Sequence, residues 1–169
     1  GGKGGFPPIT LTLPSGKTMK LTGRIDRIDK LESEEATFIR IVDYKSGSKD
    51  LSLSDVYHGL ELQLLTYLDA VLGDEEGMEP AGVLYLRLDD PIIRSNGRMS
   101  EQEIEKMILK SLKMRGLVLA DVNVIRQMDK EISGDSLIIP ARINKDNSLG
   151  RSSAANRKQF RLLRKYIKK

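Results

Sequence analysis

Residues 37–45 read TFIRIVDYK, an apolar run that ends in an acid, an aromatic residue and a lysine. An apolar run of this kind predicts a strand that is buried on both faces of a sheet. Because side chains alternate along a strand, Asp43 and Lys45 are expected to project from the same face at its end. Such a pair is either a salt bridge or part of a metal-dependent active site, and the stretch alone leaves both interpretations open.

The chain before this strand predicts a β-hairpin. Apolar and polar residues alternate over 9–13 and 18–29, on both sides of a Pro-Ser-Gly turn. Ile25 and Ile28 are three residues apart and cannot share one face of an unbroken strand. We therefore expect a bulge or a strand end near Asp26.

The chain after the buried strand alternates between helix and strand. Leucines at helical spacing predict a helix over 52–72 that ends at Gly73, and residues 81–88 predict a strand, which gives a β–α–β order. The remaining expected elements are a helix from the Ser100–Glu103 capping box to about Met114, a short helix over 121–130, a strand or strand pair within 137–143, and a final helix from Ser153. This order predicts a mixed α/β (α+β) sheet in a single domain over residues 1–169.

The composition limits the chemistry. A chain of 169 residues with 39% hydrophobic and 31% charged residues is typical of a globular domain, and no apolar run approaches the roughly 18 residues of a membrane span. The absence of cysteine excludes disulfides and Cys-ligated metal centres within this chain and fits an intracellular setting. His58 is the one histidine, which argues against His-rich metal sites, so catalysis would rely on carboxylates, lysine and a hard cation such as Mg²⁺.

The last nineteen residues carry eight lysines and arginines and no acid. Such a basic end suits a polyanion such as nucleic acid, or it is a solvated helix face that packs on an acidic neighbouring domain. The candidate phosphate contacts are Arg24, Arg27, Arg157, Lys158, Arg161 and Arg164.

The register of the predicted hairpin decides how Asp43 is interpreted. The charged segment KLESEEA, residues 30–36, is expected to be the turn, and a hairpin centred on Glu34–Glu35 pairs residues whose numbers sum to about 69. Asp26 then lies opposite Asp43, with Cβ atoms roughly 4.5–5.5 Å apart. Two carboxylates at that distance repel unless a cation lies between them, whereas Mg²⁺ is held by one or two carboxylates together with water and phosphate oxygens.

Three further side chains can belong to this site. Lys45 either forms a salt bridge with one of the aspartates or stabilises negative charge that develops on a phosphate. Gln63 and Tyr67 are four residues apart on the predicted helix and share a face, so they are either packing residues or reach the strand end.

Together these segments resemble the PD-(D/E)XK nuclease superfamily, in particular its RecB-like branch. Residues 23–26 match its G-x-x-D segment, residues 43–45 its D-x-K and residues 63–67 its Q-x-x-x-Y. The resemblance implies a restriction-endonuclease-like mixed central sheet flanked by helices. It also implies Mg²⁺, for which Mn²⁺ can substitute, held by Asp26, Asp43 and the backbone carbonyl of Tyr44. Lys45 would then assist the attacking water, while Gln63 and Tyr67 would organise the site and contact DNA.

Residues 81–93, 110–121 and 151–167 extend the resemblance to the AddB-type nuclease domains of bacterial AddAB-type helicase–nucleases. This resemblance implies a cytoplasmic exodeoxyribonuclease, ATP-dependent in the intact complex, that works with an AddA-type partner subunit. Its substrate would be a DNA single strand, released as the helicase unwinds double-strand ends during recombinational repair.

Two departures from the family pattern predict that the chain is a fragment of a larger subunit. RecB-like nucleases carry a histidine and a further acid before the G-x-x-D segment, and AddB-type domains carry four cysteines that bind a [4Fe–4S] cluster; this chain has neither feature. Weak metal binding and low activity of the isolated piece are therefore expected. The alternatives are an inert DNA-binding module and a subunit-contact domain whose aspartates are merely salt-bridged to Lys45.

Overall fold

The computed structural model describes residues 25–45, 53–73, 76–88 and 97–167, together with two short strands before them. For those two strands and for residues 53–61 only the backbone is described. The elements are β1 (Ile9–Thr12), β2 (Thr18–Leu21), β3 (Arg27–Glu32), β4 (Thr37–Lys45), α1 (Leu53–Leu72), β5 (Met78–Arg87), α2 (Glu101–Ser111), β6 (Arg115–Leu119), α3 (Val122–Met128), β7 (Gly134–Asp135), β8 (Arg142–Ile143), β9 (Ala154–Ala155) and α4 (Arg157–Ile167).

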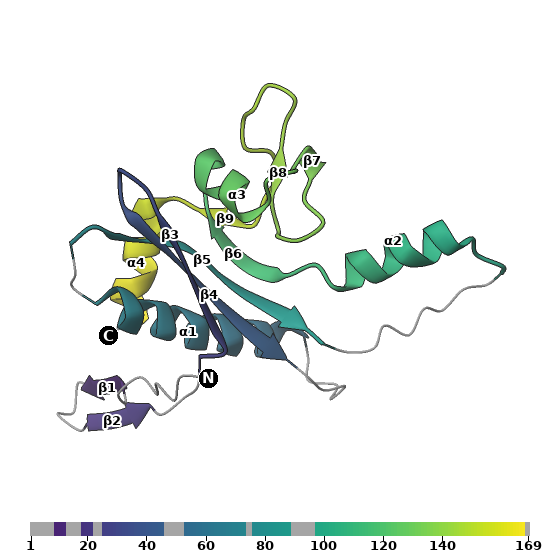
Figure 1. Cartoon of the computed structure of the whole chain (residues 1–169). Coiled ribbons are helices and arrows are strands. Elements are labelled where there is room, and N and C mark those ends of the chain that lie inside the picture. The colour runs from purple at the N-terminus through teal and green to yellow at the C-terminus, as the bar shows by residue number, and fades with distance from the viewer. Residues whose placement is uncertain are drawn as a thin grey trace.

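A five-stranded mixed sheet in the order β3-β4-β5-β6-β9 forms the centre of the molecule (Figure 1). β3 and β4 are antiparallel, and α1 carries the chain back so that β5 lies parallel to β4. β6 is antiparallel to β5, and β9 is parallel to β6. The predicted β–α–β order and the predicted mixed sheet flanked by helices are confirmed.

The β3–β4 hairpin has the predicted register. Arg27 pairs with Val42 and Glu32 with Thr37, so the numbers of paired residues sum to 69. The turn is shorter than predicted because β3 continues through Glu32. It is closed by Ser33, whose hydroxyl donates to the carbonyl of Ala36 at 2.9 Å. The predicted hairpin before it is confirmed as the antiparallel pair of β1 and β2, and the strand end expected near Asp26 is confirmed because β3 begins at Arg27. The predicted second strand of that hairpin is too long, since β2 covers only Thr18–Leu21.

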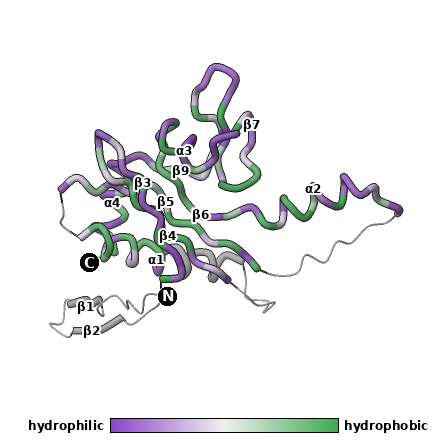
Figure 2. Tube along the Cα trace, in the orientation of Figure 1, coloured by the Kyte–Doolittle hydropathy of each residue, from purple (hydrophilic) through white to green (hydrophobic). Residues whose placement is uncertain are grey.

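Helices cover both faces of this sheet. On one face, α1 and α4 bury a core around Ile41, Leu68 and Phe160, all three of which are fully buried. On the other face, α3 and the segment that follows it pack against Val42 and Leu84. Figure 2 shows hydrophobic residues concentrated along the central strands, with hydrophilic residues frequent along α2. β4 is buried from both sides, as its apolar run predicts.

The C-terminal half differs from the predicted pattern at its short strands. The sequence pattern does not predict β6 and β9, and the predicted helix from Ser100 ends at Ser111, four residues before β6 begins. Of the predicted strand pair within 137–143, only Arg142–Ile143 forms a strand, and its partner is β7. The capping box of α2 and the end of α1 at Gly73, where φ is 51°, are as predicted.

No helix in the described ranges is long and apolar enough to cross a membrane.

Candidate active site

The end of β4 brings two carboxylates and one ammonium together. Asp43 is buried, with 6% of its surface exposed, and its Oδ2 lies 2.7 Å from the Nζ of Lys45. Asp26 lies immediately before β3, and its carboxylate accepts a hydrogen bond of 3.0 Å from the backbone N–H of Tyr44. The strand register therefore places Asp26 beside the end of β4.

The electrostatics of Asp43 are unfavourable to its ionised form. Burial raises the pKa of the Asp43 carboxyl, the nearby Asp26 carboxylate raises it further, and Lys45 offsets only part of this effect. Although the Lys45 ammonium lies at ion-pair distance, the buried Oδ2 of Asp43 accepts no well-formed hydrogen bond from any residue that the structure describes. An additional cation between the two aspartates would stabilise the ionised form of Asp43 and would give its Oδ2 a partner.

The ligands that the site offers fit a hard divalent cation whose remaining coordination positions are filled by water and by phosphate oxygens of a substrate. Within the described ranges, no group of three or more His, Cys, Asp or Glu side chains comes together, so the site offers two carboxylates and nearby backbone carbonyls. Zinc in structural sites takes four protein ligands, whereas Mg²⁺ binds through one or two carboxylates and keeps waters and phosphate oxygens. The absence of cysteine leaves no ligands for an iron–sulfur cluster in this chain.

Gln63 and Tyr67 form a pair on α1, in which Tyr67 is buried towards the sheet and Gln63 is exposed. The Nε2 of Gln63 donates to the Tyr67 hydroxyl at 2.8 Å, and Tyr67 is buried in the core beneath α1. Ile41 of β4 contributes to this same core. Because strand side chains alternate, Asp43 and Lys45 project from the face that α1 covers. The hydrogen bond of the pair joins Gln63 to Tyr67 and does not involve the aspartates.

Sequence reasoning missed Tyr85. This residue of β5 pairs in register with Asp43 and has 8% of its surface exposed. Residues paired between neighbouring strands project from the same face, so Tyr85 is the neighbour of Asp43 on the face that α1 covers. The apolar run over 81–88 predicts a strand, but the register of a parallel pair depends on the crossover helix and cannot be counted from a turn.

The candidate phosphate contacts occupy different parts of the fold. Arg27 lies opposite Val42, on the face away from α1, and its Nε donates to Asp29 at 2.7 Å. Arg40 binds the other oxygen of the same carboxylate. Arg24 and the side chain of His58 lie outside the described residues.

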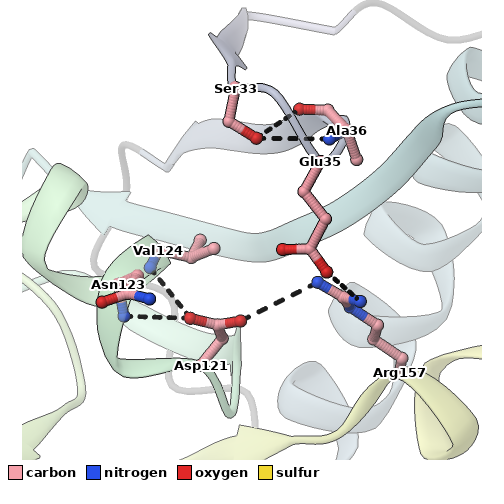
Figure 3. A network of polar contacts seen from close by, with 7 residues as sticks. All are labelled: Ser33, Glu35, Ala36, Asp121, Asn123, Val124 and Arg157. Atoms are coloured by element: carbon pink, nitrogen blue, oxygen red, sulfur yellow. Dashed lines mark hydrogen bonds and ion pairs between the residues drawn. The ribbon is translucent and has the colours of Figure 1, made fainter.

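Two of the arginines of α4 are engaged within the domain. Arg157 lies 2.8 Å from Glu35 and 3.8 Å from Asp121 (Figure 3). Its guanidinium carbon also lies over the ring of Phe38, 5.6 Å from the ring centroid. Arg164 donates to Asp69 at 2.6 Å and to the carbonyl of Gly73. Both arginines join α4 to the rest of the fold, while Lys158 and Arg161 are exposed.

Arg157→Gln is expected to lower the Tm by about 2–4 °C, because it removes a cation–π contact and the ion pairs with Glu35, in the turn between β3 and β4, and with Asp121, at the start of α3. The matched control is Arg161→Gln on the exposed side of the same helix, which should leave the Tm unchanged. Thermal unfolding followed by circular dichroism measures both. Equal Tm values for the two variants would show that the Arg157 contacts contribute no stability.

The fold and the strand-end carboxylates define a restriction-endonuclease-like class of domain. The chain belongs to the PD-(D/E)XK nuclease superfamily, whose family model matches residues 2–169. It is similar to proteins named as B-type subunits of an ATP-dependent helicase/deoxyribonuclease. The identity is 59% over 175 residues for the protein of Acetivibrio thermocellus, covering 100% of this chain, and 59% over 169 residues for that of Clostridium novyi, covering 97%. The chain spans 15% of the length of each of these relatives.

Proposed function

We propose that this domain hydrolyses DNA phosphodiester bonds with Mg²⁺ as the nuclease part of an ATP-dependent helicase–nuclease subunit. The observation that carries the proposal is the convergence of Asp26 and Asp43 at the end of β4, beside Lys45. The Oδ2 of Asp43 is buried there without a well-formed hydrogen bond from any residue that the structure describes. Membership of a nuclease superfamily and the names of the relatives support it. The finer form of the proposal is an exonuclease that acts on the single strand unwound from a double-strand end, together with an AddA-type subunit.

The residues divide the chemistry among them. Asp26, Asp43 and the carbonyl of Tyr44 would hold Mg²⁺, which when bound supplies positive charge against the phosphate oxygens. Lys45 has 38% of its side chain exposed, so its ammonium can turn from Asp43 to a water molecule or to a phosphate oxygen. The hydrogen bond between Gln63 and Tyr67 fixes the position of the Gln63 amide on the helix that covers this face.

One observation favours a second candidate, a subunit-contact domain without catalysis. The 2.7 Å ion pair of Lys45 with Asp43 is what a purely structural role for both residues would produce. It does not account for Asp26, whose negative charge lies near that pair and adds repulsion instead of balance.

Asp26→Asn in the full-length subunit, assembled with its partner subunit, tests the proposal. We expect Mg²⁺-dependent cleavage of labelled single-stranded DNA to fall by more than about 100-fold. Removing a group that only orients a metal ligand typically costs about 10–100-fold, so the removal of a ligand itself should cost more. Titration of the unmodified protein with Mn²⁺ should show a binding event that the variant lacks. Full activity in the variant, or no metal binding in either protein, would favour the subunit-contact domain.

A further inference from the structure

A recess apart from the candidate active site, which we call the basic pocket, lies at the start of β6. It has a volume of 610 Å³ and is formed by the C-terminal end of α2, the first residues of β6 and the segments around Pro140 and Arg151. Four of its lining residues are cationic, namely Lys110, Lys113, Arg115 and Arg151, and one is acidic, Asp135.

The positive charge of the basic pocket is not balanced within the domain. The Asp135 carboxylate is engaged by Arg142, whose Nη1 lies 2.6 Å away. In the part of the chain that the structure describes, none of the four cationic lining residues forms an ion pair. Like charges gathered around one recess repel each other, so the pocket favours a ligand that carries negative charge.

The remaining lining favours phosphate over base recognition. No aromatic residue lines the pocket, so it offers no surface on which a base could stack. Its two serine hydroxyls already have partners: Ser153 donates to the carbonyl of Gly116 at 2.6 Å, and Ser152 accepts from the backbone of Arg142 at 2.9 Å. Lysine and arginine contacts to phosphates carry no sequence information, which suits a strand of any sequence.

The basic pocket lies at the same end of the sheet as the aspartates. Its lining includes Ala141, which belongs to the core on the face that α3 covers, whereas Asp43 projects from the face that α1 covers, so the two are joined around the end of the sheet. Arg115 pairs with Tyr85, and Tyr85 pairs with Asp43, so the three residues form one row across β6, β5 and β4. Neighbouring strands are about 4.7–4.9 Å apart, which places the Arg115 backbone roughly 10 Å from that of Asp43. Figure 1 shows the ends of β4 and β5 on the side of the sheet from which α2 extends.

We propose that the basic pocket binds the sugar–phosphate backbone of the DNA strand that is cut at Asp26 and Asp43. The inference rests on the proposed nuclease function and adds the path that the strand takes beside the cut. An acidic segment of a partner protein has the same charge. The row from Asp43 to Arg115 favours DNA, because a polyanion held at the aspartates extends over a distance of this size.

The test uses the full-length subunit assembled with its partner, and a double variant, Lys110→Gln with Lys113→Gln. The matched control is Lys130→Gln with Lys145→Gln, two exposed lysines outside the pocket. The dissociation constant for a short single-stranded oligonucleotide is measured by fluorescence anisotropy in EDTA. KM and kcat of cleavage are measured in Mg²⁺, each over a range of salt concentrations.

The pocket variant is expected to bind the oligonucleotide on the order of tenfold more weakly than the control, with a salt slope lower by about 0.7 for each phosphate that is no longer neutralised. KM should rise, while kcat at saturating DNA stays unchanged, because neither lysine contacts the aspartates. Arg151→Gln, on the opposite wall, should act in the same direction.

A pocket variant that matches the control in affinity and in salt slope would overturn the inference. Intact DNA affinity together with failed assembly of the complex would also overturn it, in favour of an acidic protein partner. If even the unmodified complex failed to cleave DNA, the proposed nuclease function would be refuted. The anisotropy comparison would still decide whether the pocket binds the strand.

Discussion

Asp43→Asn is expected to reduce Mg²⁺-dependent DNA cleavage by at least about 100-fold and to leave the folded domain no less stable. Asparagine keeps the shape of the side chain but removes the charge that would hold the metal. The same charge is unfavourable in the fold, because burial and the neighbouring Asp26 both raise the pKa of Asp43. Its removal therefore relieves a cost at neutral pH, as is common where a site is built for function at the expense of stability.

Asp29→Asn is the matched control and is expected to do the opposite. This aspartate lies on the same hairpin but on the face away from α1, where Arg27 and Arg40 bind its two oxygens. Burial alone would raise the pKa of Asp29, but the two guanidinium groups outweigh it and hold the pKa below its ordinary value. The ionised form is thus stabilised by folding, and this stability is lost as the pH falls through the lowered pKa. Asp29→Asn should cost about 1–2 kcal/mol and leave cleavage unchanged.

Cleavage of labelled single-stranded DNA and denaturant unfolding of both variants give four measurements. The proposal requires that activity falls only in Asp43→Asn and stability only in Asp29→Asn. If Asp43→Asn destabilised the domain and Asp29→Asn did not, Asp43 would be a structural partner of Lys45, as the alternative holds.

The site can be predicted from the sequence as far as local geometry determines it. A hairpin fixes its own register through its turn, so counting across residues 30–36 is enough to place Asp26 beside the end of the strand that carries Asp43. The spacing of four between Gln63 and Tyr67 likewise requires that they share a helix face, and they are hydrogen-bonded.

The rest depends on contacts between distant segments. β9 is two residues long and owes its existence to pairing with β6, so no periodicity marks it. Tyr85 is paired with Asp43 only through the parallel register that the crossover by α1 sets. Arg157 and Arg164 look like any other cations of a basic tail, and their engagement with acids of other elements follows from where α4 packs in the fold.

Gly116→Ala is expected to destabilise the domain by at least about 3 kcal/mol and to lower its Tm by roughly 6–12 °C. Gly116 has a φ of 126°, which L side chains rarely adopt. A Cβ at this position would lie 2.2 Å from the carbonyl oxygen of Val83, on the neighbouring strand β5. Neither group is the end of a flexible side chain, so the overlap can be relieved only by separating two central strands of the sheet.

Substitutions at two other glycines separate the effect of backbone strain from the effect of the steric clash. Gly134 has a φ of 83°, but a Cβ there meets no atom within 4 Å, so Gly134→Ala tests backbone strain without a clash. A Cβ at Gly97 meets nothing within 4 Å either, and the backbone there is not in the left-handed region, so Gly97→Ala should be neutral. The expected order of destabilisation, measured by denaturant unfolding, is Gly116→Ala, then Gly134→Ala, then Gly97→Ala.

The outcome at Gly116 also tests the geometry of the candidate active site, because the pairing of β5 with β6 positions both Gly116 and the row of residues beside the aspartates. Gly116 pairs with Leu84, one step along from the pair of Arg115 with Tyr85. If Gly116→Ala were no more harmful than Gly134→Ala, β5 and β6 could not approach as closely as this register requires. The row from Asp43 through Tyr85 to Arg115 would then be wrong, and the basic pocket would lose its alignment with the aspartates. A large and specific loss at Gly116 would instead support the strand spacing on which both the candidate active site and the path of the DNA strand depend.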